Sequence, residues 1–156
     1  MERLNNKNIH YILCGVGNEQ EALQQQANKA GLHDNVHFLG FRNDVKELYK
    51  AADCFVMPSF REGLSRSIME AMASGLPCVV SRIRGNVDLI EDGVGGYLCD
   101  PNDAQDFADA LAKLAEDESL RKNMAFENLK AIKQFDVHVV ENEIKDVYRA
   151  VLGQCS

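Results

Sequence analysis

The sequence predicts a doubly wound α/β domain with a parallel sheet of about five strands and extra helices at the carboxyl end. Short apolar runs alternate with helical patterns as far as Pro101. A helical crossover returns the chain to the same end of a sheet, so neighbouring strands are parallel. The chain has 156 residues, of which 46% are hydrophobic and 26% charged, which is enough for one domain with a proper core.

The expected strands are short apolar runs at residues 9–14, 36–39, 54–57, 78–81 and 97–99. The helix expected over 18–30 is rich in Glu, Gln and Ala and stops at Gly31. Further helices are expected over 45–52, 66–74 and, as a short element, 87–91.

After Pro101 the sequence predicts three helices, over 104–116, 120–134 and 137–152. The first has Phe107, Ala110, Leu111 and Leu114 at helical spacing, and this apolar stripe is expected to pack on the sheet. The sheet core therefore covers about 9–100 and the helical part about 104–152.

The formal charge of −7 and the pI near 5.1 argue against binding nucleic acid or anionic lipid, because both need a positive field. Any phosphate group that the chain binds must therefore be held by contacts close to it, and not by the field of the whole protein. Between Ala51 and Ala112 the basic residues are arginines, which suit phosphate oxygens or are simply solvated: Arg61, Arg66, Arg82 and Arg84. No apolar run approaches the roughly 20 residues of a membrane span, and the start lacks a signal-peptide core, so we expect a cytoplasmic protein.

The cysteines are far apart and have no histidine at ligand spacing: Cys14, Cys54, Cys78, Cys99 and Cys155. This spacing argues against a metal site or a disulfide framework. Four of the five lie in apolar runs, where a reduced cysteine behaves as a small buried hydrophobe.

The most informative segment is 59–77, in which Glu62 and Glu70 flank a Gly-Leu-Ser turn that opens a helix. Free N–H groups in the first turn of a helix attract phosphate, and carboxylates accept hydrogen bonds from sugar hydroxyls. A competing interpretation is helix capping, because Ser59-x-x-Glu62 and Ser67-x-x-Glu70 both fit the capping box. Glu70 lies about 200° from Ile68 around the helix and so points away from the packed face.

Gly15-Val16-Gly17 follows the first strand, and its glycines would let a ligand approach the backbone. The residues themselves favour a simple tight turn, because Gln20 occupies the position of the third glycine of a dinucleotide fingerprint.

Residues 9–148 resemble the carboxyl-terminal domain of retaining nucleotide-sugar glycosyltransferases of family 4, the group 1 type with GT-B architecture. The matching blocks, in order, are ILCGVG, VHFLGFRNDV, LYKAADCFVMPS, REGLSRSIMEAMASGLPCVVS, LIEDGVGGYLCDPND and FDVHVVENEIKDVY. The resemblance implies a Rossmann-like donor-binding domain over 1–156. In the family, a strand that this sequence lacks lies between the equivalents of 9–14 and 54–57, and we expect these two strands to pair directly. The strand order would then be 2-1-3-4-5, which brings the loops after the first and third strands together at the switch point. The resemblance also implies a hexosyltransferase-type activity in polysaccharide or glycoconjugate synthesis.

The resemblance implies a role for each matching position. Glu62 would be the catalytic residue that orients the donor sugar, and Glu70 would accept hydrogen bonds from the ribose. The backbone of Gly63, Leu64 and Ser65 would hold the sugar and diphosphate, with Arg66 and Arg61 as phosphate contacts. Phe41 and Arg42 would meet the base, and Gly15 and Gly17 would lie near the nucleotide. The donor would be a UDP-, GDP- or ADP-sugar, and no metal or other cofactor would be required.

Parts of the family pattern are absent from the sequence. It lacks the acceptor-binding amino-terminal domain with its catalytic histidine, and also the first strand of the donor domain with its Arg and Lys. His10, His33, His37 and His138 match no catalytic motif. We therefore expect a partner domain or subunit that binds the acceptor and makes any peripheral contact with the inner membrane face. The isolated chain is expected to be inactive and to bind the donor only weakly.

Two other functions remain open at this point. One is a truncated or split-gene binding or assembly module, which turnover by the isolated chain would exclude. The other is an unrelated flavodoxin-like signalling domain whose glutamates only cap helices, which nucleotide-sugar binding would exclude.

Overall fold

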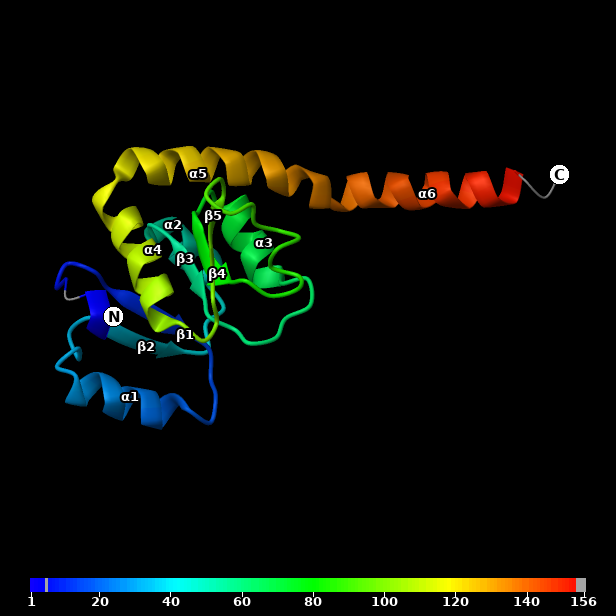
Figure 1. Cartoon of the computed structure of the whole chain (residues 1–156). Coiled ribbons are helices and arrows are strands. Elements are labelled where there is room, and N and C mark those ends of the chain that lie inside the picture. The colour runs from blue at the N-terminus through cyan, green and yellow to red at the C-terminus, as the bar shows by residue number, and fades with distance from the viewer. Residues whose placement is uncertain (5, 154–156) are drawn as a thin grey trace.

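The computed structural model describes residues 1–4 and 6–153 and has the α/β fold that the sequence predicts (Figure 1). The five strands lie in the first two thirds of the chain, with a helix between successive strands except between β4 and β5, and helices alone follow. The strands are β1 (Tyr11–Cys14), β2 (Val36–Gly40), β3 (Phe55–Met57), β4 (Cys78–Ser81) and β5 (Gly96–Cys99). The helices are a 3₁₀ turn (Glu2–Leu4), α1 (Gln20–Lys29), α2 (Val45–Ala51), α3 (Arg66–Ala73), α4 (Ala104–Glu116), α5 (Glu118–Ala131), a second 3₁₀ turn (Ile132–Phe135) and α6 (Val137–Gly153).

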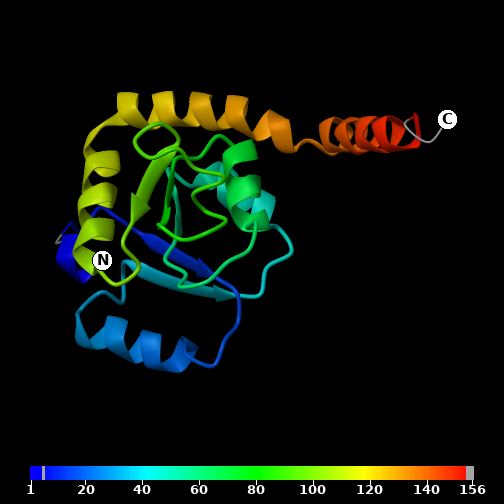
Figure 2. The same ribbon diagram turned by 45° about the vertical axis from the view of Figure 1, so that its right-hand side comes forward.

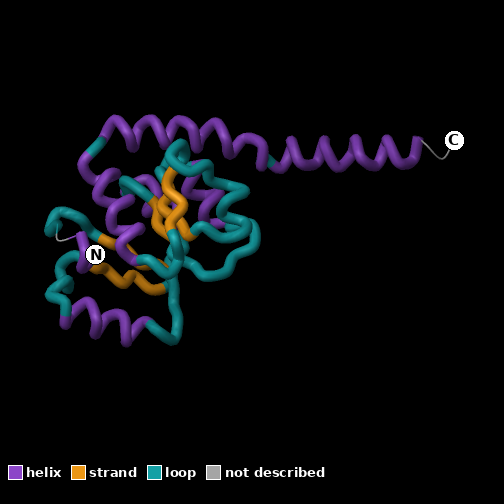
Figure 3. The backbone as a smooth tube through the Cα atoms, in the orientation of Figure 1, coloured by secondary structure: helices purple, strands orange, loops and turns teal. Residues whose placement is uncertain are grey.

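The strands form two parallel sheets, β1-β2 and β3-β4-β5 (Figure 3). The expected pairing of β1 with β3 is therefore wrong. Burial raises the pKa of Tyr11 at the start of β1, and the thiol of Cys54 beside β3 raises it further, so the two sheets lie near one another without exchanging backbone hydrogen bonds. β1 is only half-buried, and its Ile12 is 43% exposed.

The short helix expected over 87–91 is also wrong, because residues 84–89 form turns. Gly85 has a φ of +88°, and the Asn86 side chain is buried and donates from Nδ2 to the Ser81 carbonyl at 2.9 Å. The chain bends at these residues before a regular helix can start. The helix expected over 120–134 is α5, which passes into the 3₁₀ turn at Ile132.

The core lies between β4 and the helices. Ile68, Ala71 and Met72 form the fully buried face of α3, as the sequence predicts, and pack with β4 residues. On the other side, Ala110 and Leu114 of α4 pack with Val79 and Met124, and Phe107 and Leu111 are partly buried there. The apolar stripe of α4 thus covers the sheet.

Asn128 on α5 is the polar centre of this core, with only 1% of its surface exposed. Its Nδ2 donates to the carbonyls of Leu76 at 2.7 Å and Gly95 at 2.6 Å. These two bonds hold the segments before β4 and β5 against α5. A Cβ on Gly95 would lie 2.1 Å from Asn128 Oδ1, so glycine is required for this close contact.

α5 and α6 run end to end, and α6 extends beyond the body of the protein in both ribbon views (Figures 1 and 2). Val140, Ile144 and Val147 of α6 are at least 38% exposed. Among the described residues, no helix combines the length and apolar character that crossing a bilayer requires.

Candidate functional site

The segment that contains both predicted glutamates follows β3 and opens α3. The helix begins at Arg66, and Ser65 is its N-cap residue, with φ −75° and ψ 115° and no side-chain capping bond. Met69 N–H donates to the Ser65 carbonyl at 3.2 Å, so the N–H groups of the first turn are left for another acceptor. Ser67 lies inside the helix and Ser59 in the preceding loop, which contradicts the capping-box interpretation of either glutamate.

Glu70 lies on the outer face of α3, as predicted, with its side chain 42% exposed. Arg66 donates from Nε to Glu70 Oε1 at 2.9 Å, and Tyr49 Oη on α2 lies 3.5 Å from Oε2. Burial of the phenol, together with the nearby Glu70 charge, raises the pKa of Tyr49 to about 12. Tyr49 therefore stays protonated as a donor toward the carboxylate. This contact joins two helices, so no local sequence pattern signals it.

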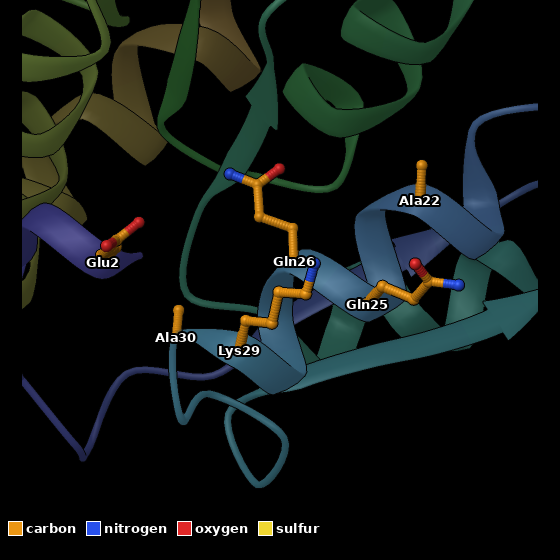
Figure 4. Close-up of a pocket in the computed structure, with 6 residues that line it drawn as sticks. All are labelled: Glu2, Ala22, Gln25, Gln26, Lys29 and Ala30. Carbon is orange, nitrogen blue, oxygen red and sulfur yellow. The ribbon is translucent and has the colours of Figure 1, made fainter.

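Glu70 also lines a cleft of about 340 Å³ between α3 and the second 3₁₀ turn. The cleft combines charged and apolar residues: Arg66, Met69, Glu70, Ala73, Ile132, Lys133, Phe135 and Asp136. A second hollow of similar volume, lined by Glu2 and by α1 residues Ala22, Gln25, Gln26, Lys29 and Ala30, contains none of the predicted site residues (Figure 4).

The loops after β1 and β2 lie side by side. Gly15 N–H donates to the Gly40 carbonyl at 2.8 Å, and Gly15 has a φ of +130° that favours glycine. Arg42 is paired with Asp44, donating from Nε to Oδ1 at 2.7 Å, and this hydrogen bond lowers the pKa of Asp44. The Arg42 side chain is thus occupied, and Gly17 lies in the exposed turn.

Large apolar side chains are exposed in the loops after β1, β2 and β3. Val16, Phe41 and Phe60 are each more than 70% exposed, and Leu64 is 53% exposed. These loops follow the carboxyl ends of parallel strands, where open α/β sheets bind ligands. Of these four residues, only Phe41 and Leu64 are predicted donor contacts. Val16 and Phe60 lie in loops without a periodic pattern.

Gly85, which the sequence analysis did not single out, lies against the glutamate loop. A Cβ built on Gly85 would lie 1.9 Å from the Gly63 carbonyl oxygen. The turn after β4 therefore touches the backbone beside Glu62.

The histidines and cysteines do not gather into a further site. His10 and His37 stack on one another, with Nδ1 and Nε2 3.0 Å apart. The four described cysteines are free thiols, and the described part of the chain holds no group of three metal-binding side chains. Cys155 lies outside the described residues.

Cys14 is expected to be the described cysteine that an alkylating reagent modifies first. It is exposed. Burial raises the pKa of Cys14 as well, but it raises that of Cys54 to about 11 and that of Cys99 to about 12, and Cys78 is fully buried. Peptide mass spectrometry after brief labelling of a Cys155→Ser variant would measure the order. Faster modification of Cys78 or Cys99 would contradict this packing.

Comparison with known proteins gives the family. The sequence model of "Glycosyl transferases group 1" matches residues 1–130. The chain belongs to this family. A galactosyltransferase of Escherichia coli, UDP-Gal:alpha-D-GlcNAc-diphosphoundecaprenol alpha-1,3-galactosyltransferase, is 39% identical to this group 1 chain over 141 residues. The match covers 88% of the chain and 36% of that relative.

Two further relatives are similar. The Campylobacter jejuni enzyme N,N'-diacetylbacillosaminyl-diphospho-undecaprenol alpha-1,3-N-acetylgalactosaminyltransferase is 35% identical over 117 residues, covering 75% of the chain and 31% of that relative. The crystal structure of Anabaena HepE in complex with UDP is 30% identical, with a TM-score of 0.88, and the match covers 96% of the chain and 43% of HepE. This group 1 chain thus spans about a third of the length of the curated relatives it matches.

Proposed function

We propose that the chain is the donor-binding half of a retaining glycosyltransferase and holds a nucleotide-diphosphate sugar at the start of α3. One observation carries the proposal: Glu62 and Glu70 flank a helix start that has no side-chain cap. The free N–H groups and the helix dipole suit a diphosphate, and the carboxylates suit hydroxyl groups on either side of it. Membership of the group 1 family supports this assignment.

The relatives favour a UDP-hexose as donor. The Escherichia coli relative is named for UDP-Gal, and HepE was crystallised with UDP. The two named transferases form α linkages, the outcome that retention gives from an α-linked sugar nucleotide. Their names also contain undecaprenol diphosphate, so we propose a lipid-linked acceptor, bound by a separate acceptor domain or subunit.

Each part of the proposed site has one task. Glu70 accepts hydrogen bonds from the ribose, and Glu62 from the sugar. The backbone of 63–65 holds the diphosphate, and Arg66 exchanges its bond to Glu70 for a phosphate oxygen. Phe41 and the main chain at Arg42 meet the base beside Gly15 and Gly17. These roles are supported by the hydrogen bond that joins the loops at Gly15 and Gly40 and by the exposure of the loops.

The proposed chemistry is electrostatic. As the bond between the anomeric carbon and the diphosphate breaks, negative charge grows on the leaving oxygen, and the N-terminus of α3 stabilises it. Glu62 orients the sugar, and we propose that neither a metal ion nor a protein nucleophile takes part. The acceptor hydroxyl, presented by the acceptor domain, attacks the anomeric carbon on the face from which the diphosphate leaves, and its proton passes to the departing diphosphate oxygen.

Titration of the ¹⁵N-labelled chain with UDP-, GDP- and ADP-sugars tests this function. We expect UDP-hexoses to shift the amide resonances of the 62–70 segment at millimolar ligand, because the site is open and the net charge of −7 opposes a diphosphate. Salt should weaken the binding further by screening the local cationic contacts. A chain that shows no shifts in this segment with any donor lacks the proposed function.

Replacing Glu62 with alanine is expected to reduce discrimination between UDP-hexose and UDP. The variant should bind UDP as the unmodified chain does and UDP-hexose roughly tenfold more weakly, because only the sugar loses a charged partner. The matched control is Glu116→Ala, which removes an exposed glutamate from the end of α4. If Glu62→Ala weakened the binding of UDP and of UDP-hexose equally, Glu62 would contact the nucleotide instead of the sugar.

A further inference from the structure

Gly85 and Gly63 are in closer contact than any side chain at position 85 would allow. Gly85 has a φ of +88°, and a Cβ built on it would lie 1.9 Å from the Gly63 carbonyl oxygen and 2.7 Å from its carbonyl carbon. The next nearest atom, at 3.5 Å, is the Glu62 carbonyl oxygen. The hydrogen atoms of Gly85 therefore face the backbone of the glutamate loop directly.

The two sides of this contact are anchored to different degrees. Asn86, next to Gly85, is fully buried, and its Nδ2 donates to the Ser81 carbonyl at the end of the buried strand β4. Ile90 N–H in turn donates to the Asn86 carbonyl at 2.9 Å. By contrast, residues 58–64 share no backbone hydrogen bond with other described residues. The turn is fixed to the core, and the glutamate loop depends on packing contacts for its position.

We propose that Gly85 is a positioning residue for the donor sugar. By resting against the Gly63 carbonyl, the fixed turn sets where the loop carries Glu62, and only glycine leaves room for this arrangement. The inference rests on the proposed donor site and adds a specificity determinant that contacts the loop rather than the sugar. Glu70 belongs to α3, whose own buried face holds it, so the proposed ribose contact does not depend on Gly85.

The test compares Gly85→Ala with Gly93→Ala. Gly93 has a φ of +77°, and a Cβ built on it has no atom within 4 Å. Both variants therefore carry a similar backbone strain, but only the Gly85 variant places a methyl group against the glutamate loop. In the free protein, Gly85→Ala should shift the amide resonances of 62–64, and Gly93→Ala should leave them unchanged. Gly85→Ala should weaken the binding of UDP-hexose roughly tenfold, the loss expected for one misplaced charged partner, and the binding of UDP less, because the backbone of 63–65 also holds the diphosphate.

If the alanine variant folds poorly, a second pair, Gly85→Asn and Gly93→Asn, takes its place, because asparagine accepts positive φ more readily. Unchanged resonances of 62–64 in a folded Gly85 variant would overturn the proposal, as would equal weakening of UDP and UDP-hexose. The proposal would also be overturned if neither Gly85 variant folded while both Gly93 variants did, because the contact would then be a requirement of folding. If the unmodified chain binds no nucleotide, the proposed function fails, and the resonances still decide whether Gly85 positions the loop.

Discussion

Asn128→Ala is expected to lower the free energy of unfolding by about 2–4 kcal/mol, because it removes a side-chain donor from two buried carbonyl groups, of which the Gly95 carbonyl keeps its bond from Cys78 N–H at 3.2 Å. The carbonyls of Leu76 and Gly95 both accept from Asn128 Nδ2, and Asn128 is 1% exposed. The lost side-chain volume adds a cavity between α5 and the sheet. Urea denaturation followed by circular dichroism measures the change.

The matched control for this substitution is Asn123→Ala on the same helix, where the asparagine is exposed. It should change the free energy of unfolding by less than about 0.5 kcal/mol. Similar decreases in the free energy of unfolding of the two variants would show that Asn128 does not hold the segments before β4 and β5 against α5.

Glu70→Ala is expected to weaken UDP binding about tenfold or more, since the loss of a charged hydrogen-bond partner costs roughly 1.5–3 kcal/mol. Its effect on stability should be small, because the pair with Arg66 is an exposed i,i+4 pair worth about 0.3–0.5 kcal/mol. Calorimetric titration beside thermal melts separates the two quantities.

Glu141→Ala provides the control for Glu70, because Glu141 makes an exposed i,i+4 pair with Lys145 on α6. This variant should show the same small stability change with unaltered UDP affinity. If Glu70→Ala lowered the melting temperature and left UDP affinity unchanged, the carboxylate would serve α3 and not a ligand.

The elements that the sequence predicted best are those in which local pattern and burial agree. β4 consists of four buried residues, and α4 has an apolar stripe and an N-cap aspartate, Asp103, that accepts from Gln105 N–H. Both have the predicted bounds. The expected helix over 87–91 failed because the buried side chain of Asn86 and the positive φ of Gly85 decide the local backbone, and these are tertiary effects.

The strand order depends on long-range contacts that no local pattern encodes. Each sheet is built from strands joined by short crossovers, whereas pairing β1 with β3 requires two sheets to meet. The same limit applies to the site. Glu62 and Glu70 are visible in the sequence because they flank one helix start, and Tyr49 and Gly85 are not, because each reaches the site from another element.

The most direct test of the donor site is a residue-by-residue map of amide shifts in the ¹⁵N-labelled chain on addition of a UDP-hexose. We predict that the shifts concentrate in three places: the loop at Gly15 and Gly17, the loop at Phe41 and Arg42, and the 62–70 segment. Saturable shifts in these segments would establish the site at the start of α3. Shifts confined to the α1 hollow of Figure 4, or none at all, would contradict it.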